Sequence, residues 1–293
     1  MSAVFKSKMS FYPPLAKGGD IVYNKITSPL YTTSPKKSST EKIPRKEDRK
    51  VEQLYTIPVN EAFDGATEEG TCICPMCTLY DRLEENELDL ILGASMMEPD
   101  VRQKTNVQGF CHRHYGNMFH RKNRLGLALM LESHLAEIEK SLSDDGLSAL
   151  FSGVGAGPMK KLDRLEGSCY VCNRIEGHFT RMFDTVLLLW CEDSAFRRKL
   201  AAQKYFCLPH YRRLLALAKT TLSKKAFPDF YAALSQVERA YLSALSEDVS
   251  WFCKKFDYRY ADEPWKNAKD AVERSIRFLS GNEGGPAAGG VKK

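Results

Sequence analysis

Cysteine and histidine recur in two motifs that have the spacing of metal ligands. The chain contains two CxxC motifs, Cys74–Cys77 and Cys169–Cys172, and each is followed, after 33 or 34 intervening residues, by a CxxH motif. The CxxH motifs are Cys111–His114 and Cys207–His210. Thiolate and imidazole are the ligands of structural zinc, and paired ligands separated by two residues are common in such sites. The pattern therefore predicts two metal sites of three cysteines and one histidine each.

We interpret the two nearly equal frames as a duplication in which each copy holds one zinc ion, Zn²⁺. The predicted ligands are Cys74, Cys77, Cys111 and His114 for the first ion, and Cys169, Cys172, Cys207 and His210 for the second. Four protein ligands leave no position open for water or substrate, which is typical of structural zinc. An iron–sulfur cluster is an alternative, although four cysteines are its usual ligands.

Three further cysteines do not belong to these motifs. Cys72 has no counterpart in the second copy, where Gly167 occupies the equivalent position. It is either a spare thiol or an alternate ligand. Cys191 and Cys253 follow apolar helical patterns, so we expect them to be small core residues.

The segments between the ligand motifs are predicted to be helices. Apolar residues recur every three or four positions from the first CxxC motif to Gly93, and again over residues 175–190. A helix of about 15 residues is about 22 Å long, so one helix out and one segment back would return the chain to its CxxC motif. Pro209 suits the first turn of a helix, which places Cys207 at a helix start, where the helix dipole favours a thiolate.

Two more helical stripes are predicted downstream of the CxxH motifs. The first core stripe consists of Leu125, Leu129, Leu131, Leu135, Ile138 and Leu142. The second consists of Phe230, Leu234, Val237, Tyr241, Leu245, Val249, Phe252 and Phe256. Pro264 is suited to starting a last helix, docked by a salt-bridged seam that includes the charged residues of 257–265. Because no strand pattern of comparable strength occurs, the predicted fold is all-α.

Glycine and proline at Gly153–Pro158 mark the predicted boundary between the copies. The chain then divides into a first helical repeat (51–152) and a second repeat with C-terminal helices (153–280), each stapled by its own CxxC…CxxH site. Residues 1–50 and 281–293 are predicted to be disordered tails. Residues 1–50 are either a basic contact arm or the product of a start codon assigned too far upstream, with Val51 as the native start.

Charge and hydropathy exclude some classes of function. The formal net charge is +6, but residues 1–50 hold 11 Lys and Arg against 4 Asp and Glu, and the remaining residues hold 32 against 33. The body therefore lacks the basic excess of a nucleic-acid-binding domain. No run of about 18 apolar residues exists to span a membrane. Without a signal peptide, paired CxxC motifs suggest a cytoplasmic protein with reduced thiols.

Several stretches resemble a bacterial family known only as a domain of unknown function. They are LYTIPVNEAF (54–63), CPMC (74–77), MEPDVRQKTNVQGFCHRH (97–114), NRLGLALMLESHL (123–135), SCYVC (168–172), FCLPH (206–210) and KKFDYRYADEPWKNAKDA (254–271). The resemblance covers about residues 54–280. It implies the extent of the fold and the cysteine frame, and it implies no activity.

No common catalytic motif accompanies the metal frames. The chain contains none of GxGxxG, GxxxxGK[ST], GxSxG or HExxH, so an enzyme is not the favoured interpretation. We expect a zinc-stapled binding or adaptor module with an unidentified protein partner. The alternative is a thiol-based redox or metal-stress sensor that releases zinc on oxidation. A metalloenzyme with an exchangeable ligand is a third hypothesis.

Overall fold

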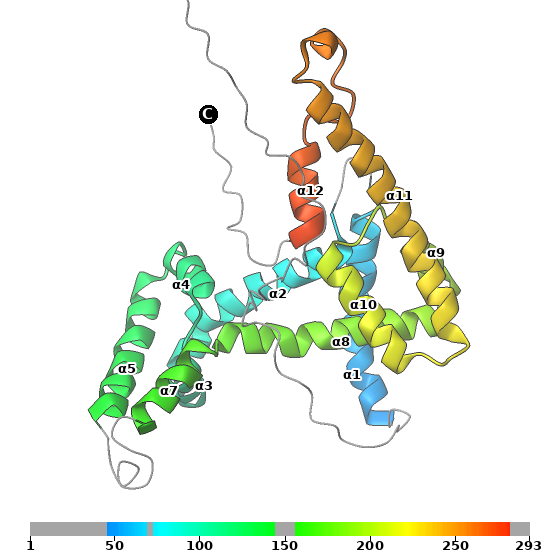
Figure 1. Cartoon of the computed structure of the whole chain (residues 1–293). Helices are drawn as coiled ribbons and strands as arrows, with labels where there is room; N and C mark the ends of the chain where they lie inside the picture. Colours follow the sequence, from blue (N-terminus) through cyan, green and yellow to red (C-terminus); the bar gives the residue numbers. More distant parts are fainter. Residues whose placement is uncertain (1–45, 69–72, 144–155, 282–293) are drawn as a thin grey trace, which may run out of the picture. The chain divides into compact units, whose positions relative to one another are not determined.

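The computed structural model describes residues 46–68, 73–143 and 156–281. These belong to one compact unit, residues 41–293. Within the described residues the secondary structure consists of α-helices and two short 3₁₀ helices, without strands, which confirms the all-α prediction (Figure 1). None of the helices described is both long enough and apolar enough to span a lipid bilayer. Residues 1–45 of the predicted tail, Cys72, and the tail after Gly281 lie outside the described residues. Residues 46–50, predicted to be disordered, are helical, so the prediction is wrong for that part of the tail.

The helices fall into an N-terminal half, α1 to α5, and a C-terminal half, α7 to α12. The first half contains α1 (Lys46–Gly65), α2 (Pro75–Leu92), η2 (Ala94–Met97), α3 (Pro99–Gln108), α4 (His112–Phe119) and α5 (Arg124–Ser143). The second contains α7 (Ala156–Glu166), α8 (Tyr170–Glu192), α9 (Ser194–Ala201), α10 (Leu208–Thr221), α11 (Ala226–Lys254), η3 (Tyr258–Tyr260) and α12 (Ala271–Ser280).

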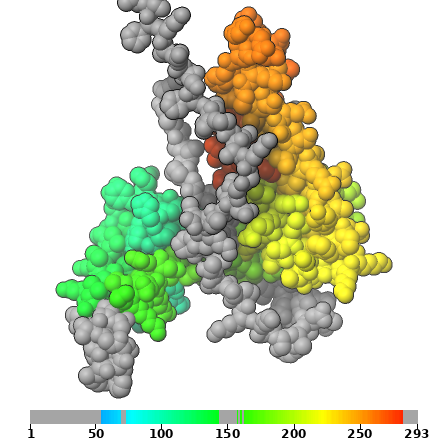
Figure 2. Space-filling view, viewed as in Figure 1, coloured from blue at the N-terminus to red at the C-terminus, as the bar shows by residue number. Residues whose placement is uncertain are grey.

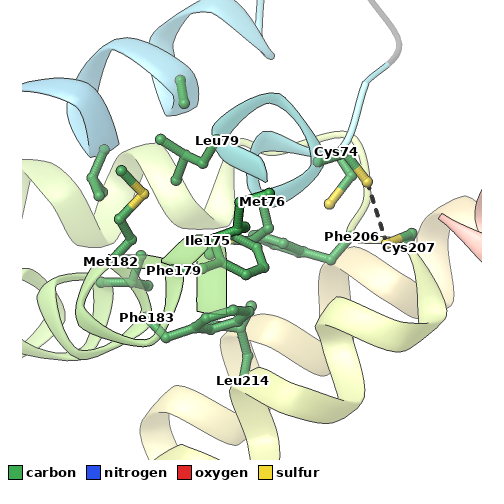
Figure 3. Close-up of a cluster of buried hydrophobic side chains, with 14 of the residues drawn as sticks. Cys74, Met76, Leu79, Ile175, Phe179, Met182, Phe183, Phe206, Cys207 and Leu214 are labelled. Atoms are coloured by element: carbon green, nitrogen blue, oxygen red, sulfur yellow. Dashed lines mark hydrogen bonds between the residues drawn. The ribbon is translucent and has the colours of Figure 1, made fainter. Parts of the chain in front are cut away.

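Helix α8 lies at the centre of the core, because it packs against α1, α2, α9 and α10. Its predicted buried face is confirmed in Ile175, Phe179, Phe183, Val186, Leu187 and Trp190. Phe179 and Phe183 make an edge-to-face contact with ring centroids 4.8 Å apart. Met76 and Leu79 of α2 and Leu214 of α10 belong to the same apolar cluster (Figure 3). Residues from both halves thus share one core.

Helices α2 and α8 run antiparallel. Arg174, early in α8, pairs with Glu87, late in α2, at 3.1 Å. Further along, Phe179 of α8 meets Tyr80, nearer the start of α2, with ring centroids 5.5 Å apart. The start of each helix therefore points toward the end of the other.

Helix α5 forms as predicted, but only half of its predicted core stripe is even partly buried, namely Leu129, Leu131 and Ile138. Leu125, Leu135 and Leu142 are exposed, whereas Leu127 and Met130 are buried. The helix packs against α3, α4 and α7 through this second face. Leucine recurs on more than one face of α5, so periodicity could not select the face that packs.

Helix α11 confirms much of its predicted stripe, and its outer surface is visible in Figure 2, coloured yellow to orange. Phe230, Leu234, Val237 and Leu245 are buried, whereas Phe256, beyond the helix end, is exposed. The last helix does not begin at Pro264 but at Ala271. Nor does the predicted seam in 257–265 dock it: Arg274 pairs with Asp248 and Asp270, each at 2.9 Å.

Cys191 and Cys253 are exposed, so the prediction that they are core residues is wrong. Each lies one residue before the end of its helix, α8 or α11. The apolar pattern of these helices continues into their last turns. Among the described residues, no neighbouring element covers the Cys191 and Cys253 side chains there.

Candidate metal centres

All four ligand motifs adopt the same local structure, a helix N-terminus. Cys74, Cys111, Cys169 and Cys207 are the N-cap residues of α2, α4, α8 and α10. The second ligand of each motif lies three residues later, in the first turn, so both side chains reach the same end of the helix. The positive end of the helix dipole stabilises thiolates at this position. The prediction that Cys207 starts a helix is confirmed.

The eight predicted ligands come together in two tetrads. Site A consists of Cys74, Cys77, Cys207 and His210, and site B consists of Cys111, His114, Cys169 and Cys172. In each tetrad the candidate ligand atoms all lie within 4.8 Å of one another. Each tetrad contains three cysteines and one histidine, as the prediction required, but the predicted grouping is wrong. Each tetrad joins the CxxC motif of one half to the CxxH motif of the other, so neither half has a site of its own.

Helix lengths explain the exchange of partners. Helix α2 has 18 residues and α3, which follows it, has 10. At 1.5 Å per residue α2 is about 27 Å long and α3 about 15 Å long. Helix α8 has 23 residues and α9 has 8, so these helices are about 34 Å and about 12 Å long. Neither α3 nor α9 alone is long enough to return the chain to its own CxxC motif, and each CxxH motif meets the start of the antiparallel neighbour.

Site A has the dimensions of a tetrahedral metal site. The Nδ1 atom of His210 lies 3.0 Å from the sulfur of Cys207, 3.5 Å from that of Cys77 and 3.7 Å from that of Cys74. The Cys77 and Cys207 sulfurs are 3.6 Å apart. Zinc bonds of 2.3 Å to sulfur and about 2.0 Å to nitrogen give tetrahedral edges of about 3.8 Å and about 3.6 Å.

Site A is enclosed by the core, and all four of its residues are buried. The His210 ring packs against Phe179 and Phe183, with ring centroids 5.3 and 6.0 Å apart. Figure 3 shows Cys74 and Cys207 at the margin of this apolar cluster, beside Phe206. This environment excludes water from the ligand sulfurs.

The C-terminal end of α12 also covers site A. Gly281 caps that helix in a left-handed conformation with φ +67°. A Cβ atom at this position would lie 3.1 Å from the Cys207 sulfur and 3.8 Å from the Cys77 sulfur. Glycine is required here both by its backbone angle and by its close approach to the ligands.

A buried carboxyl fixes the segment that leads into site A. Glu238 of α11 accepts a hydrogen bond from the Phe206 amide at 3.0 Å. Burial raises the pKa of Glu238 to about 8, and the negative charge of the Cys74 thiolate also raises it. The carboxyl is therefore largely protonated at neutral pH.

Site B has similar internal distances but lies closer to solvent. The His114 Nδ1 atom is 3.1 Å from the Cys111 sulfur and 3.3 Å from the sulfurs of Cys169 and Cys172. The Cys111 and Cys172 sulfurs are 3.9 Å apart. His114 and Cys169 are buried, whereas Cys111 and Cys172 are only half-buried.

Two hydrogen bonds to backbone carbonyls hold the two motifs of site B together. The Tyr170 amide donates to the Gly109 carbonyl at 3.0 Å, and the Ser168 hydroxyl donates to the Gln108 carbonyl at 2.7 Å. Gly109 ends α3 with φ +60°, and a Cβ atom there would lie 3.1 Å from the His134 ring. The turn before Cys111 is therefore tied to the start of α8.

A carboxylate orients the histidine of site B. Glu84 of α2 lies 3.0 Å from His114 Nε2, on the side of the ring opposite the sulfurs. Arg113 pairs with the same carboxylate at 2.9 Å. Burial acts to raise the pKa of Glu84, but the hydrogen bond from His114 and the charge of Arg113 outweigh it and lower that pKa. A carboxylate that accepts the second ring proton is the usual companion of a metal-bound histidine.

No sequence pattern marks Glu84 as a partner of His114. Helix α2 carries five acidic residues, and their spacing distinguishes none of them as a partner of His114. Only the exchanged pairing of the motifs brings α4 beside this part of α2.

The thiols in each tetrad differ in acidity, because closely spaced sulfurs cannot all carry negative charge. Hydrogen bonds with Cys207 and Cys74, together with burial, raise the pKa of Cys77. Burial also acts to raise the pKa of Cys74, but hydrogen bonds from Cys207 and its other neighbours outweigh it and hold that pKa well below its usual value. In site B, hydrogen bonding among the thiols raises the pKa of Cys172 and lowers that of Cys111. A divalent cation would replace the retained protons, so both donor sets fit a bound metal.

The contact between Glu84 and His114 predicts a selective effect on one site. Replacing Glu84 with alanine should weaken the affinity of site B for an added divalent metal ion by about 10-fold to 100-fold, because the histidine loses its orienting partner. Site A should be unaffected. Competition with a chromogenic chelator measures both affinities, and Glu85→Ala, an exposed neighbour on α2, is the matched control. Equal weakening in both variants would contradict the assigned role.

The position of Gly281 predicts that one added methyl group is harmful there. Gly281→Ala should lower the free energy of unfolding by about 1 kcal/mol or more, because of its positive φ and its contact with Cys207. Gly177→Ala, in the interior of α8 with open space around the position, should instead stabilise the protein by about 0.5–1 kcal/mol. Denaturant unfolding of the zinc-loaded variants tests this. A Gly281→Ala protein as stable as the parent would refute the close approach.

Comparison with known proteins places the chain in a family. No curated protein and no solved structure matches it. A family model described as a family of unknown function, DUF6062, matches residues 50–285, a span that includes both tetrads. The resemblance seen in the sequence motifs is thereby confirmed. The chain belongs to DUF6062, a family of unknown function.

Proposed function

We propose that the protein binds two zinc ions, one in each tetrad, and that these ions hold the two halves of the helical unit together. The distances among the ligand atoms carry this proposal, because they agree with the edges of a tetrahedron around zinc. The thiols lie buried or half-buried at helix N-termini, where the helix dipole favours thiolates. A divalent cation would replace the protons that the less acidic thiols retain.

A structural role for the ions follows from the donor sets. Each ion would have four protein ligands and no free position for water or substrate. Three sulfurs and one nitrogen in tetrahedral arrangement favour zinc over the oxygen-preferring ions magnesium and calcium. The ions would act as crosslinks between helix starts, α2 to α10 and α4 to α8.

We also propose that the helical unit, crosslinked by the two ions, binds another protein. Helix α12 buries Ala271, Arg274 and Phe278. It exposes a second apolar row, Val272, Ile276 and Leu279, on its other side. Apolar rows left in solvent are typical of interaction surfaces. The balanced charge of residues 51–293 favours a protein partner over nucleic acid.

Metal analysis tests the zinc proposal directly. Protein purified without added metal should contain two zinc ions per chain by inductively coupled plasma mass spectrometry. Replacement with cobalt should give the absorption of tetrahedral cobalt with thiolate ligands. Metal-free protein, or iron with visible charge-transfer bands, would contradict the proposal.

Removal of the ions should also destabilise the fold. Structural zinc contributes about 10 kcal/mol or more in small domains, so treatment with a strong chelator should abolish cooperative unfolding. Near-ultraviolet circular dichroism during denaturation is the measurement, and the same chelator saturated with zinc is the control. Unchanged unfolding after complete zinc removal would show that the ions are not structural.

A further inference from the structure

The two tetrads differ in their access to solvent. In site A all four ligand residues are buried, with aromatic rings on one side of His210 and Gly281 against the sulfurs of Cys77 and Cys207. In site B, Cys111 and Cys172 are half-buried, and the charged side chains of Glu84 and Arg113 stand beside the site. A dissolved small molecule can therefore reach sulfurs in site B that have no accessible equivalent in site A.

Sulfur spacing alone does not distinguish the sites. The Cys77 and Cys207 sulfurs of site A are 3.6 Å apart, and the Cys111 and Cys172 sulfurs of site B are 3.9 Å apart. A disulfide requires about 2.05 Å, so the two sulfurs would need to approach by about 1.5 Å in site A and by about 1.9 Å in site B. Exposure decides between them, because the oxidant must first contact a sulfur.

We infer that site B is an oxidation site for peroxides, at which Cys111 and Cys172 form a disulfide and release the zinc ion, while site A keeps its ion. This inference rests on the proposed zinc binding and assigns the redox response to one of the two tetrads. It makes site A the permanent crosslink and site B the reversible one.

The chemistry balances with hydrogen peroxide as the oxidant. The Cys111 thiolate attacks one peroxide oxygen, the O–O bond breaks, and hydroxide leaves, which gives a sulfenic acid on Cys111. The Cys172 thiolate then attacks that sulfur and displaces a second hydroxide, forming the S–S bond. The two sulfurs together lose two electrons, and peroxide gains them. Two ligands remain, Cys169 and His114, and the ion departs to a chelator.

The proposed disulfide would preserve the connection that the ion provides. Cys111 is the N-cap of α4 and Cys172 lies in the first turn of α8, so the new bond joins the same two helix starts. Neither residue belongs to site A, and both lie only partly buried at the edge of the core. Oxidation would thus change the local structure at site B without unfolding the protein, and a dithiol would reverse it.

The test uses the full-length protein in a Cys191→Ser, Cys253→Ser background, which removes two exposed thiols outside the tetrads. Zinc content is measured first, and fewer than two ions per chain would count against the proposed function itself. Hydrogen peroxide is then added with a chromogenic chelator present. We expect release of one of the two zinc ions, a peptide linked through Cys111 and Cys172 by mass spectrometry, and rebinding after reduction.

Other outcomes would overturn the inference while leaving zinc binding intact. These are simultaneous release of both ions, retention of both, or a disulfide between another pair of cysteines. A Cys111→Ser variant provides the matched check, since it should begin with one ion and keep it at the same peroxide dose. Loss of that remaining ion would show that site A is also reactive, and would refute the assignment.

Discussion

The structure depends on two antiparallel helices whose first turns each supply a CxxC motif. Helix α2 starts at site A and passes site B at Glu84, whereas α8 starts at site B and passes site A at Phe179 and Phe183. Helices α3 and α9, which follow them, are each shorter than the helix they follow, and each CxxH motif lies at the start of the other long helix. The duplicated motifs therefore join the two halves instead of closing each half separately.

Placing three thiolates close together in each tetrad raises the free energy of the fold when no cation is bound. Three sulfurs within a few ångströms repel one another when ionised, and burial penalises each charge further. Four helix N-termini offset part of this cost, and at site B Arg113 adds a positive charge beside the ligands. A divalent ion would provide the rest, so that the proposed metal binding and the packing of α2 against α8 would reinforce each other.

Sequence spacing predicted the local features of the sites and missed the long-range ones. The ligand types, the helix starts and the buried face of α8 depend on neighbours within one or two turns, and the motifs encode them directly. The pairing of the motifs depends on the lengths of α3 and α9, and the role of Glu84 depends on that pairing. The exposed leucines of α5, and Cys191 and Cys253, show the same limit, because an apolar stripe does not specify which neighbour covers it.

Zinc content of paired variants tests the exchange of motifs most directly. The double variant Cys74→Ser, Cys207→Ser removes two ligands of site A, so it should keep one zinc ion per chain. The double variant Cys74→Ser, Cys111→Ser removes one ligand from each site and should keep none. If instead the first variant bound no zinc and the second kept one ion, each half would close its own site, and the crossed tetrads would be contradicted.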